Sequence, residues 1–410
     1  MKLAQRRTAT EVTPYDKLQA LQKDAKFLAG ANNRSDSCIV ISVFGSAFDD
    51  DDIDAVGEVI RRQWVGPGSV VNELEAKLSA HCDGASVALV NSASAGLEMA
   101  IKSLRVSKGG EVIVPTNTWN SCANAVVLAG HHPVFCDVDP VSGLMTADTV
   151  RREISPRTVA IMVVHYAGYC VDLESMGEFG LPIIEDAAHA ISSTYRGSRV
   201  GTVGEIGVFS FDSVKNLASP DLGAVVSRDP EIIAHVLAHR YSGIGAAGYS
   251  AAHTKREWWI PSQKGIGPKF APNDLAAALV LSQLKRINHA QEGRRALWIL
   301  YLNALSDVVG LKMPPPVSLE ESHSYFTFFI KVLDGRRNEL AHFLLEKGIY
   351  STVRYYPLHL QDVFKRYVKP EQTFPGAVGF SSSVLNLPLH PRLNESNIET
   401  VTSAIREFMG

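Results

Sequence analysis

The sequence predicts an α/β protein: a mostly parallel sheet of seven strands flanked by helices, followed by a smaller C-terminal α+β domain. Two observations predict this class. From about residue 85 to residue 226, short β-branched runs alternate with amphipathic helical stretches, as in a parallel sheet buried by helices on both faces. The most apolar stretches, such as residues 159–164, have the length of a strand and not that of a membrane helix.

The expected elements follow in chain order. Residues 49–52 are four aspartates, which we interpret as the acidic first turn of a helix over 53–63, because the helix dipole favours negative charge there. The strands and helices of the sheet region are expected at 86–90, 95–104, 111–114, 118–129, 134–138, 146–153, 159–164, 173–179, 182–185, 206–211 and 223–227. Helices over 229–242 and 273–308 follow, and then a strand at 324–332 and helices at 336–347 and 395–409.

These elements predict three parts: a polar N-terminal extension over 1–37, a large domain over 38–308 and a small domain over 309–410. The extension is too short and too weakly basic to indicate a DNA-binding segment.

Composition excludes several classes of protein. Forty Lys+Arg against 43 Asp+Glu give a net charge of −3, which does not favour a nucleic-acid surface. No apolar segment follows the basic N-terminal residues, so a secretory signal is not expected. The five cysteines are odd in number and contain no CxxC, which favours reduced thiols in the cytoplasm. We interpret His131-His132 as surface residues and expect no metal site.

Four segments at expected strand ends carry chemistry, because ligands of α/β proteins bind at strand ends. The first is the run of small residues at 91–97, where Ser94 and free backbone N–H groups would make an anion site, or an ordinary helix cap. The second contains Trp119, which could stack on a planar cofactor or belong to the core.

The third segment, 183–189, ends a buried strand at Asp186, whose charge needs a partner: a cationic aromatic nitrogen or a structural salt bridge. The fourth, 208–216, places Lys215 after a buried strand. A lysine there is a Schiff-base nucleophile if its pKa is lowered, and otherwise a surface charge.

Together the four segments indicate pyridoxal 5′-phosphate (PLP). This cofactor needs a phosphate cradle, a stacking aromatic, a carboxylate for its ring nitrogen and a lysine for its aldehyde. All four occur in that order. Neither GxGxxG after a strand nor a Walker A motif is present, so dinucleotide and P-loop cradles are not indicated.

Here the sequence resembles the DegT/DnrJ-type aminotransferases, fold type I PLP enzymes that act mostly on nucleotide-linked keto sugars. The resemblance covers about residues 41–409. The matching segments are 64–68 (WVGPG), 134–139 (VFCDVD), 165–168 (HYAG), 185–189 (EDAAH), 209–211 (FSF) with Lys215-Asn216, and 357–360 (PLHL).

The resemblance implies a role for each matching residue. Lys215 matches the lysine that forms the Schiff base, Asp186 the partner of the ring nitrogen, and His189 the neighbour of the ring hydroxyl. Further matches are Trp119 over the ring; Ser94, Ala95 and Ser210 at the phosphate; Lys269, in 267–270, at the partner subunit's cofactor; and His359, Arg354 and Tyr166 on the substrate side.

The sequence departs from the family pattern at three places. Ser92-Ala93-Ser94 stands where relatives have Ser-Gly-Thr, and Asp212 replaces a frequent histidine. Residues 220–223 read PDLG where relatives have Gly-Glu-Gly-Gly. The lysine is kept, so relatives that carry histidine there and perform dehydration are a poorer match.

The resemblance implies a homodimeric transaminase with shared active sites that moves an amino group, from L-glutamate, to a keto sugar linked to a nucleotide, in amino-sugar or secondary-metabolite biosynthesis. Three alternatives stay open: a PLP-dependent eliminase or cyclase, an aminotransferase acting on a cyclitol ketone, and a sensor without turnover. The carbon aminated, its stereochemistry, and the choice of glutamate or glutamine as donor are not fixed by the sequence.

Overall fold

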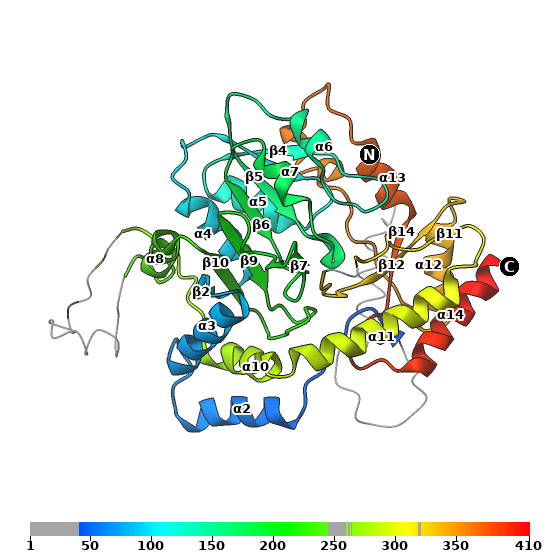
Figure 1. The fold of residues 1–410 in the computed structure, drawn as a ribbon, viewed down its shortest axis with the longest axis horizontal. Coiled ribbons are helices and arrows are strands. Elements are labelled where there is room, and N and C mark those ends of the chain that lie inside the picture. The colour runs from blue at the N-terminus through cyan, green and yellow to red at the C-terminus, as the bar shows by residue number, and fades with distance from the viewer. Residues whose placement is uncertain (1–40, 245–259, 261–262, 264, 319–320) are drawn as a thin grey trace, which may run out of the picture. The chain divides into compact units, whose positions relative to one another are not determined.

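A seven-stranded sheet lies at the centre of the structure (Figure 1). Its strands are β2 (Ser86–Val90), β3 (Glu111–Pro115), β4 (His132–Cys136), β5 (Thr158–Val164), β6 (Ile183–Asp186), β9 (Ile206–Ser210) and β10 (Gly223–Ser227). Their order is β2-β10-β9-β6-β5-β3-β4, and β10 is antiparallel to both of its neighbours while the remaining pairs are parallel. The predicted mostly parallel, seven-stranded sheet is confirmed.

The computed structural model describes residues 41–244, 260, 263, 265–318 and 321–410, all within one compact unit, Val40–Gly410. The N-terminal extension predicted over residues 1–37 lies outside the described residues. The boundary near residue 308 between a large and a small domain stays a prediction.

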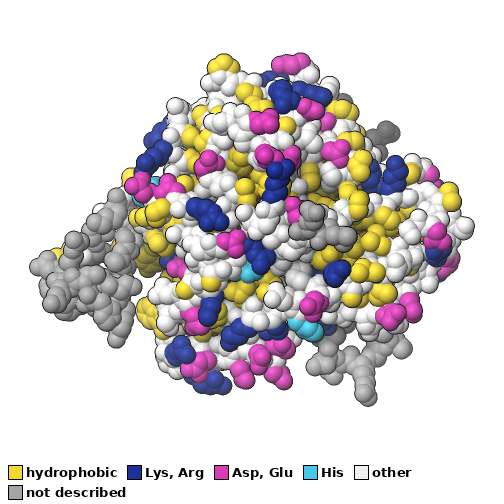
Figure 2. Space-filling view, viewed as in Figure 1, with side chains coloured by type: hydrophobic (Ala, Val, Ile, Leu, Met, Phe, Trp, Pro, Cys, Tyr) yellow, Lys and Arg dark blue, Asp and Glu magenta, His cyan; other side chains and the backbone are white. Residues whose placement is uncertain are grey.

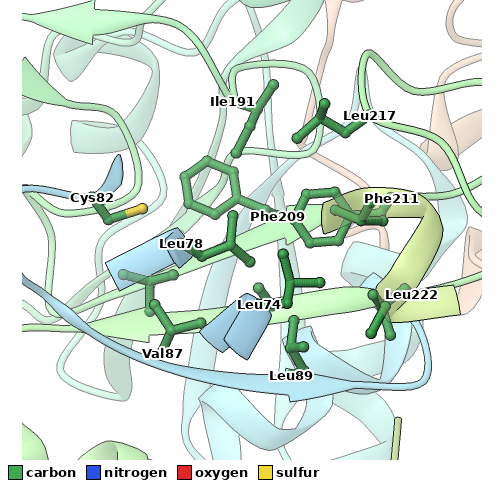
Figure 3. Packing of buried hydrophobic residues seen from close by; sticks show 14 of the residues in the cluster. Leu74, Leu78, Cys82, Val87, Leu89, Ile191, Phe209, Phe211, Leu217 and Leu222 are labelled. Carbon is green, nitrogen blue, oxygen red and sulfur yellow. The ribbon is translucent and has the colours of Figure 1, made fainter. Parts of the chain in front are cut away.

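Apolar side chains cover one face of the sheet between the strands and the helix α3 (Ser69–His81) (Figure 3). Leu74 and Leu78 of α3 pack there with Phe209 of β9 and with Phe211, which follows that strand. Because side chains alternate along a strand, Ser210 between the two phenylalanines faces the other way. On the opposite face, α4 (Ala93–Ser103), α5 (Asn120–Leu128) and α8 (Pro230–His239) contribute to a second apolar cluster.

The aspartate run begins a helix as expected. Helix α2 (Asp50–Arg61) has Asp49 as its N-cap and Asp52 as the reciprocal partner of a capping box. Helix α3 was not predicted, because its N-cap, Gly68, provides no capping side chain. Its first N–H groups donate instead to the carboxylate of Asp274, about two hundred residues further along the chain; the N–H of Val71 lies 3.0 Å from Asp274 Oδ1.

The prediction of one continuous helix over 273–308 was wrong. The segment forms two helices, α10 (Asp274–Leu284) and α11 (Ile287–Leu305). At the break Arg286 has non-helical dihedral angles (φ −113°, ψ 15°), and its guanidinium pairs with Asp49 and Asp52 at the start of α2. The break between α10 and α11 thus coincides with the contact of Arg286 to α2. The spacing of apolar residues does not reveal this break, because it continues across it.

The C-terminal part is α+β, as expected. Strands β11 (Leu311–Lys312), β12 (Phe328–Val332) and β14 (Val384–Leu387) form an antiparallel sheet, and α14 (Glu395–Met409) packs on α11 and on α12 (Arg337–Glu346). The remaining elements are α6 (Ala147–Arg151), α7 (Leu173–Gly177), α13 (Pro375–Ser383), the antiparallel pair β7 (Thr194–Tyr195) and β8 (Ser198–Arg199), and the parallel pair β1 (Ile41–Ser42) and β13 (Ile349–Tyr350).

Acidic and basic side chains are interspersed over the face shown in Figure 2. In the described part of the chain, no helix is long and apolar enough to cross a membrane. The described cysteines are all unpaired, and no group of three or more candidate metal ligands occurs among the described residues.

Candidate functional site

A cavity of about 520 Å³ opens where β6 and β9 end. In α/β proteins, ligands bind beyond the carboxyl ends of the parallel strands, which is where this cavity lies. The residues that line it come from the start of α4, the segment before α5, the loops after β6 and β9, and the segment 352–355. Seven of the residues predicted from the sequence line this cavity: Ser94, Trp119, Asp186, His189, Ser210, Lys215 and Arg354.

Lys215 lies on a tightly held loop. Its N–H donates to the carbonyl of Asp212 (2.9 Å), and the amide of Asn216 donates to the carbonyl of Ser324 (2.6 Å). Its Nζ lies 4.8 Å from the centre of the Phe326 ring. Burial, with the positive charge of Arg354 as a further cause, lowers the pKa of Lys215 to about 8. A larger fraction of this amine is therefore neutral near neutral pH, as a nucleophile or proton acceptor requires.

Asp186 ends β6 with few partners. One carboxylate oxygen accepts the N–H of Ala188 at 3.0 Å, and the thiol of Cys122 donates to the other at 3.1 Å. The side chain is buried, yet it lines the cavity. Since each carboxylate oxygen accepts more than one hydrogen bond, Asp186 keeps acceptor capacity for a ligand.

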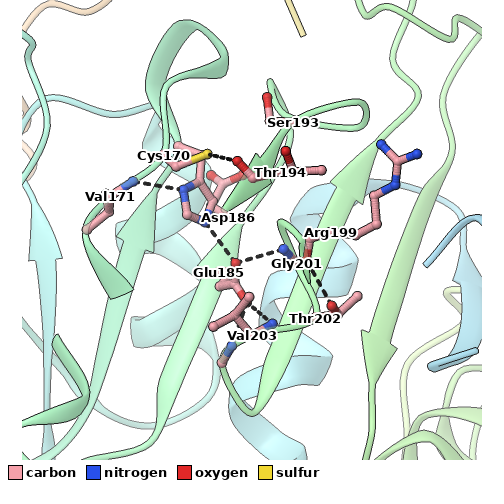
Figure 4. A network of polar contacts seen from close by, with 12 residues as sticks. Cys170, Val171, Glu185, Asp186, Ser193, Thr194, Arg199, Gly201, Thr202 and Val203 are labelled. Carbon is pink, nitrogen blue, oxygen red and sulfur yellow. Dashed lines mark hydrogen bonds and ion pairs between the residues drawn. The ribbon is translucent and has the colours of Figure 1, made fainter. Parts of the chain in front are cut away.

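The preceding residue, Glu185, is held by a closed network (Figure 4). Its carboxylate accepts the N–H groups of Gly201, Val203 and Gly204 at 2.6 to 2.9 Å and the Nε2–H of His165 at 2.9 Å. Burial acts to raise the pKa of Glu185, but these donors outweigh it and hold the pKa below its ordinary value. Glu185 therefore fixes the end of β6.

The start of α4, where the sequence predicts an anion site, lines the cavity with residues that differ in part from those predicted. Ser92 is the N-cap, and its hydroxyl accepts the N–H of Ala95 at 3.1 Å. The N–H of Ala95 is therefore taken, and the structure brings Ser92, Ala93 and Ser94 to the cavity in place of Ala95. Gly223 permits the close approach of β10, since a Cβ atom there would lie 2.6 Å from the backbone of Ser92.

Arg354 lies between two aromatic rings at the far side of the cavity. Its guanidinium carbon is 5.1 Å from the ring centre of Phe44 and 5.0 Å from that of Phe326. The side chain is buried, and within the described part of the chain its Nε has no hydrogen-bond partner. A guanidinium with a free Nε–H group in a cavity suits a ligand carboxylate or phosphate.

His189 stacks on Phe326, with ring centres 4.0 Å apart. Its Nδ1 accepts the N–H of Ala167 at 3.2 Å, so in the neutral ring Nε2 carries the hydrogen and donates to the hydroxyl of Tyr355 at 2.9 Å. Burial holds the pKa of His189 well below its ordinary value, which keeps the ring neutral.

Three further predicted residues do not line the cavity. Tyr166 is fully buried and donates to the carbonyl of Arg354 at 2.7 Å, so it supports that residue's backbone. The ring of His359 contacts the hydroxyl of Thr116 (2.7 Å between Nδ1 and Oγ1) and stacks on Phe374. Lys269 is exposed, with its Nζ 5.8 Å from the centre of the Tyr241 ring.

Among the residues that sequence reasoning missed are Phe44 and Tyr355, which line the cavity, and Cys122 and Phe326, which contact Asp186 and Lys215. Tyr355 follows Arg354 directly, and Phe326 lies in an aromatic segment, 325–329, which gives a weak signal. Phe44 and Cys122 give none, because their contribution depends on contacts between segments far apart in the sequence.

The residues present fit a planar cofactor that carries a phosphate. A serine-lined helix start lies at one side, and Trp119, 61% exposed, leaves a ring face free. Asp186 supplies the acceptor, and the volume is typical of a small-molecule site. Two further carboxylates, Asp212 and Asp221, also line the cavity. Burial and the nearby Asp212 raise the pKa of Asp221 to about 6.

The chain is similar to known aminotransferases over most of its length. The model of the DegT/DnrJ/EryC1/StrS aminotransferase family matches residues 46–406. The dTDP-4-dehydro-2,3,6-trideoxy-D-glucose 4-aminotransferase of Saccharopolyspora spinosa is 32% identical over 364 residues, 87% of this chain and 94% of the relative.

Two solved structures have the same fold. The aminotransferase TlmJ from Streptoalloteichus hindustanus superposes with a TM-score of 0.83 at 34% identity, over 90% of this chain and 98% of TlmJ. DesV from S. venezuelae, in complex with a ketimine intermediate, superposes with a TM-score of 0.79 at 29% identity, over 88% of this chain and 94% of DesV.

Proposed function

Because this chain belongs to the DegT/DnrJ/EryC1/StrS aminotransferase family, a family of PLP-dependent enzymes, we propose that it transfers an amino group from L-glutamate to a keto sugar carried on a nucleotide. The observation that carries the proposal is that Lys215 and Asp186 line the same cavity, beside the start of α4. The relative from S. spinosa, which is named for a dTDP-linked keto sugar, supports the acceptor class.

PLP, when bound, withdraws the electrons that a substrate carbon releases as it loses a proton. Lys215 would hold the cofactor through its amine, and that amine, once released, would be placed to accept the proton that the amino-bearing substrate carbon loses. Asp186 would hold a proton on the ring nitrogen. Ser94 and Ser210 would hold the phosphate, and Trp119 and His189 would hold the ring.

The substrate side centres on Arg354, whose guanidinium has a free Nε–H group and binds a carboxylate of the amino donor. The buried hydroxyl of Tyr166 holds the Arg354 carbonyl and makes Tyr166 a positioning residue. His359, which lies outside the cavity lining, acts at most through Thr116.

We also infer that the site is shared across a homodimer. The carboxylates of Asp212 and Asp221 line the cavity and would repel a phosphate dianion. A further cation near the start of α4 would therefore be needed to stabilise the phosphate. Lys269 does not line its own chain's cavity and is exposed, as a residue that reaches a neighbouring subunit must be.

Mixed dimers test this arrangement. Lys215→Ala and Lys269→Ala chains are unfolded together and refolded. If Lys269 acts in the neighbouring site, each mixed dimer holds one site with both lysines, so up to about one quarter of wild-type activity returns. If Lys269 acts in its own site, none returns. An unimpaired Lys269→Ala homodimer would place Lys269 outside the site altogether.

The proposed reaction is tested in two halves. The protein is loaded with PLP and reduced with borohydride, and the modified lysine is identified by mass spectrometry. Lys215 should carry the cofactor. Lys285→Ala changes an exposed lysine and is the control, which should leave this labelling unchanged. L-Glutamate should then convert the bound cofactor to its amino form. The amino form is offered dTDP-linked 4-keto sugars and a cyclitol ketone.

Each outcome of the second half identifies a function. Amination of the nucleotide sugar supports the proposal, and amination of the cyclitol alone replaces its acceptor. No conversion by glutamate or glutamine would favour an eliminase or cyclase on the same fold. Cellular location, which we expect to be cytoplasmic, needs a separate fractionation experiment.

A further inference from the structure

Lys215 also lines a second cavity, again of about 520 Å³. This cavity lies between the segment before α2, the lysine loop, the first three turns of α11 and the segment that follows β14. Most of its lining residues differ from those of the first cavity, and Arg354 and Asp186 are not among them.

The charges of the two cavities differ. The first has three acidic lining residues, Asp186, Asp212 and Asp221, against two basic ones. The second has four basic lining residues, Lys215, Arg286, Arg294 and Arg392, against the single acidic residue Asp49. Low-dielectric walls lined by one sign of charge concentrate ions of the opposite sign.

Arg286 is already neutralised, since Asp49 and Asp52 pair with it. Arg294 is different. Its side chain is only 2% exposed, and no carboxylate among the described residues lies within ion-pair distance of it. Its Nη1 donates to the carbonyl of Leu389 at 3.0 Å, while its Nε has no hydrogen-bond partner in the described part of the chain.

A buried cation without a counter-ion is unfavourable unless a ligand supplies the charge. Burial lowers the pKa of Arg294 to about 10, so the side chain still carries its charge at neutral pH. Arg392 and His289, both exposed, line the same cavity, and Arg392 adds a cation without a carboxylate partner among the described residues.

We propose that this second cavity binds an oxyanion, the phosphate or carboxylate group of a small molecule, between Arg294 and Arg392. The planar guanidinium groups suit both kinds of group, since each presents two oxygens to a fork of N–H donors. The ligand lies next to Lys215 without occupying the first cavity. The inference rests on the second cavity alone and does not depend on the acceptor of the amino group.

Titration calorimetry tests the site on the PLP-loaded protein, in which the cofactor's phosphate occupies the first cavity. Inorganic phosphate and succinate are the two probes, and they separate a phosphate source from a carboxylate source. Arg392→Gln should weaken the binding of whichever probe binds by about tenfold, as expected for loss of one charge-assisted hydrogen bond. Arg294→Lys keeps the charge but loses the fork, and it should also weaken binding.

Two control variants locate the effect. Arg295→Gln changes an exposed arginine on the same helix that does not line the cavity, and it should bind the probes as the unmodified protein does. Arg354→Gln removes a cation of the first cavity and should leave in place the binding that Arg392→Gln weakens. Loss of all probe binding in Arg354→Gln would place the probe in the first cavity and overturn the proposal. If Arg294→Lys fails to fold, the exposed Arg392 still decides the question. Absence of binding by either probe, or binding that Arg392→Gln leaves unchanged, overturns the proposal.

Discussion

Glu185 and Asp186 are consecutive carboxylates on β6, but the two faces of the sheet give them different surroundings. Glu185 accepts four hydrogen bonds and has no place in the cavity lining. Asp186 accepts one backbone N–H and one thiol and lines the cavity. Strand alternation sends neighbouring side chains to opposite faces, so one residue of separation decides which carboxylate meets a ligand.

The comparison shows how a structural carboxylate differs from one available for chemistry. Both are buried, so burial alone does not separate them. The difference is the number of donors already in place. A saturated carboxylate stabilises the fold around it, whereas one with free acceptor capacity can bind a proton-bearing ligand atom.

The largest expected effect is on catalysis at Asp186. Asp186→Asn removes the charge that would hold a proton on the cofactor ring nitrogen, and should lower kcat by about a thousandfold, since each 1.4 kcal/mol of barrier is tenfold in rate. The melting temperature should stay within about 3 °C of the unmodified protein, because the amide replaces few hydrogen bonds. Steady-state kinetics and thermal melting measure the two effects.

Asp148→Asn, at an exposed carboxylate, is the matched control and should change neither quantity. Near-normal turnover of Asp186→Asn would show that another residue, or none, faces the ring nitrogen.

The next effect is on stability at Glu185. Glu185→Gln places an amide group against backbone N–H donors and leaves His165 without its carboxylate, which should lower the free energy of unfolding by about 3 kcal/mol. Urea unfolding followed by circular dichroism measures it, with Glu178→Gln at an exposed position as control. Unchanged stability with lost turnover would reverse the roles assigned to the two carboxylates.

Most strands and helices of the large sheet region, and many of the residues that line the first cavity, were predicted from the sequence. The strands of the seven-stranded sheet were found because each is an apolar run of strand length, and β2, β10 and α14 were found with the bounds that they have in the structure. Asp186 and Lys215 were found because each follows such a run.

Features that depend on distant contacts were not predictable from local pattern. The start of α3 is capped by Asp274, and the break before α11 coincides with pairing of Arg286 to the start of α2. The role of Phe326 is of the same kind, since its ring contacts Lys215, His189 and Arg354 from a separate segment.

A smaller effect is expected on the pKa of Lys215, which lines the same cavity as Asp186. With a pKa of about 8, roughly one tenth of the amine is neutral at pH 7, and the neutral fraction rises as pH increases through 8. Arg354→Gln removes a positive charge that lowers this pKa, so the midpoint should move upward toward the ordinary value of 10.5.

The measurement is the rate at which the cofactor-free protein captures PLP, fixed with borohydride at each pH. Arg152→Gln, at an exposed position, should leave the midpoint near 8. A midpoint that stays in place in Arg354→Gln would mean that burial alone lowers the pKa of Lys215.

The smallest expected effect concerns Cys122, the side-chain donor to Asp186. Burial raises the pKa of the Cys122 thiol far above its ordinary value, so the thiol keeps its proton and donates to Asp186 Oδ2 throughout the working pH range. Cys122→Ala removes a weak donor, and a net hydrogen bond of about 1 kcal/mol corresponds to roughly a fivefold change in kcat. Cys122→Ser keeps a hydroxyl donor in nearly the same place and should recover most of that loss. Because Cys122 contacts Asp186 and does not line the cavity, the glutamate KM should stay constant in both variants while kcat changes. Equal loss in the alanine and serine variants would indicate that Cys122 acts by filling space between α5 and β6, and the hydrogen bonds of Asp186 would then carry less of its positioning than the contrast with Glu185 suggests.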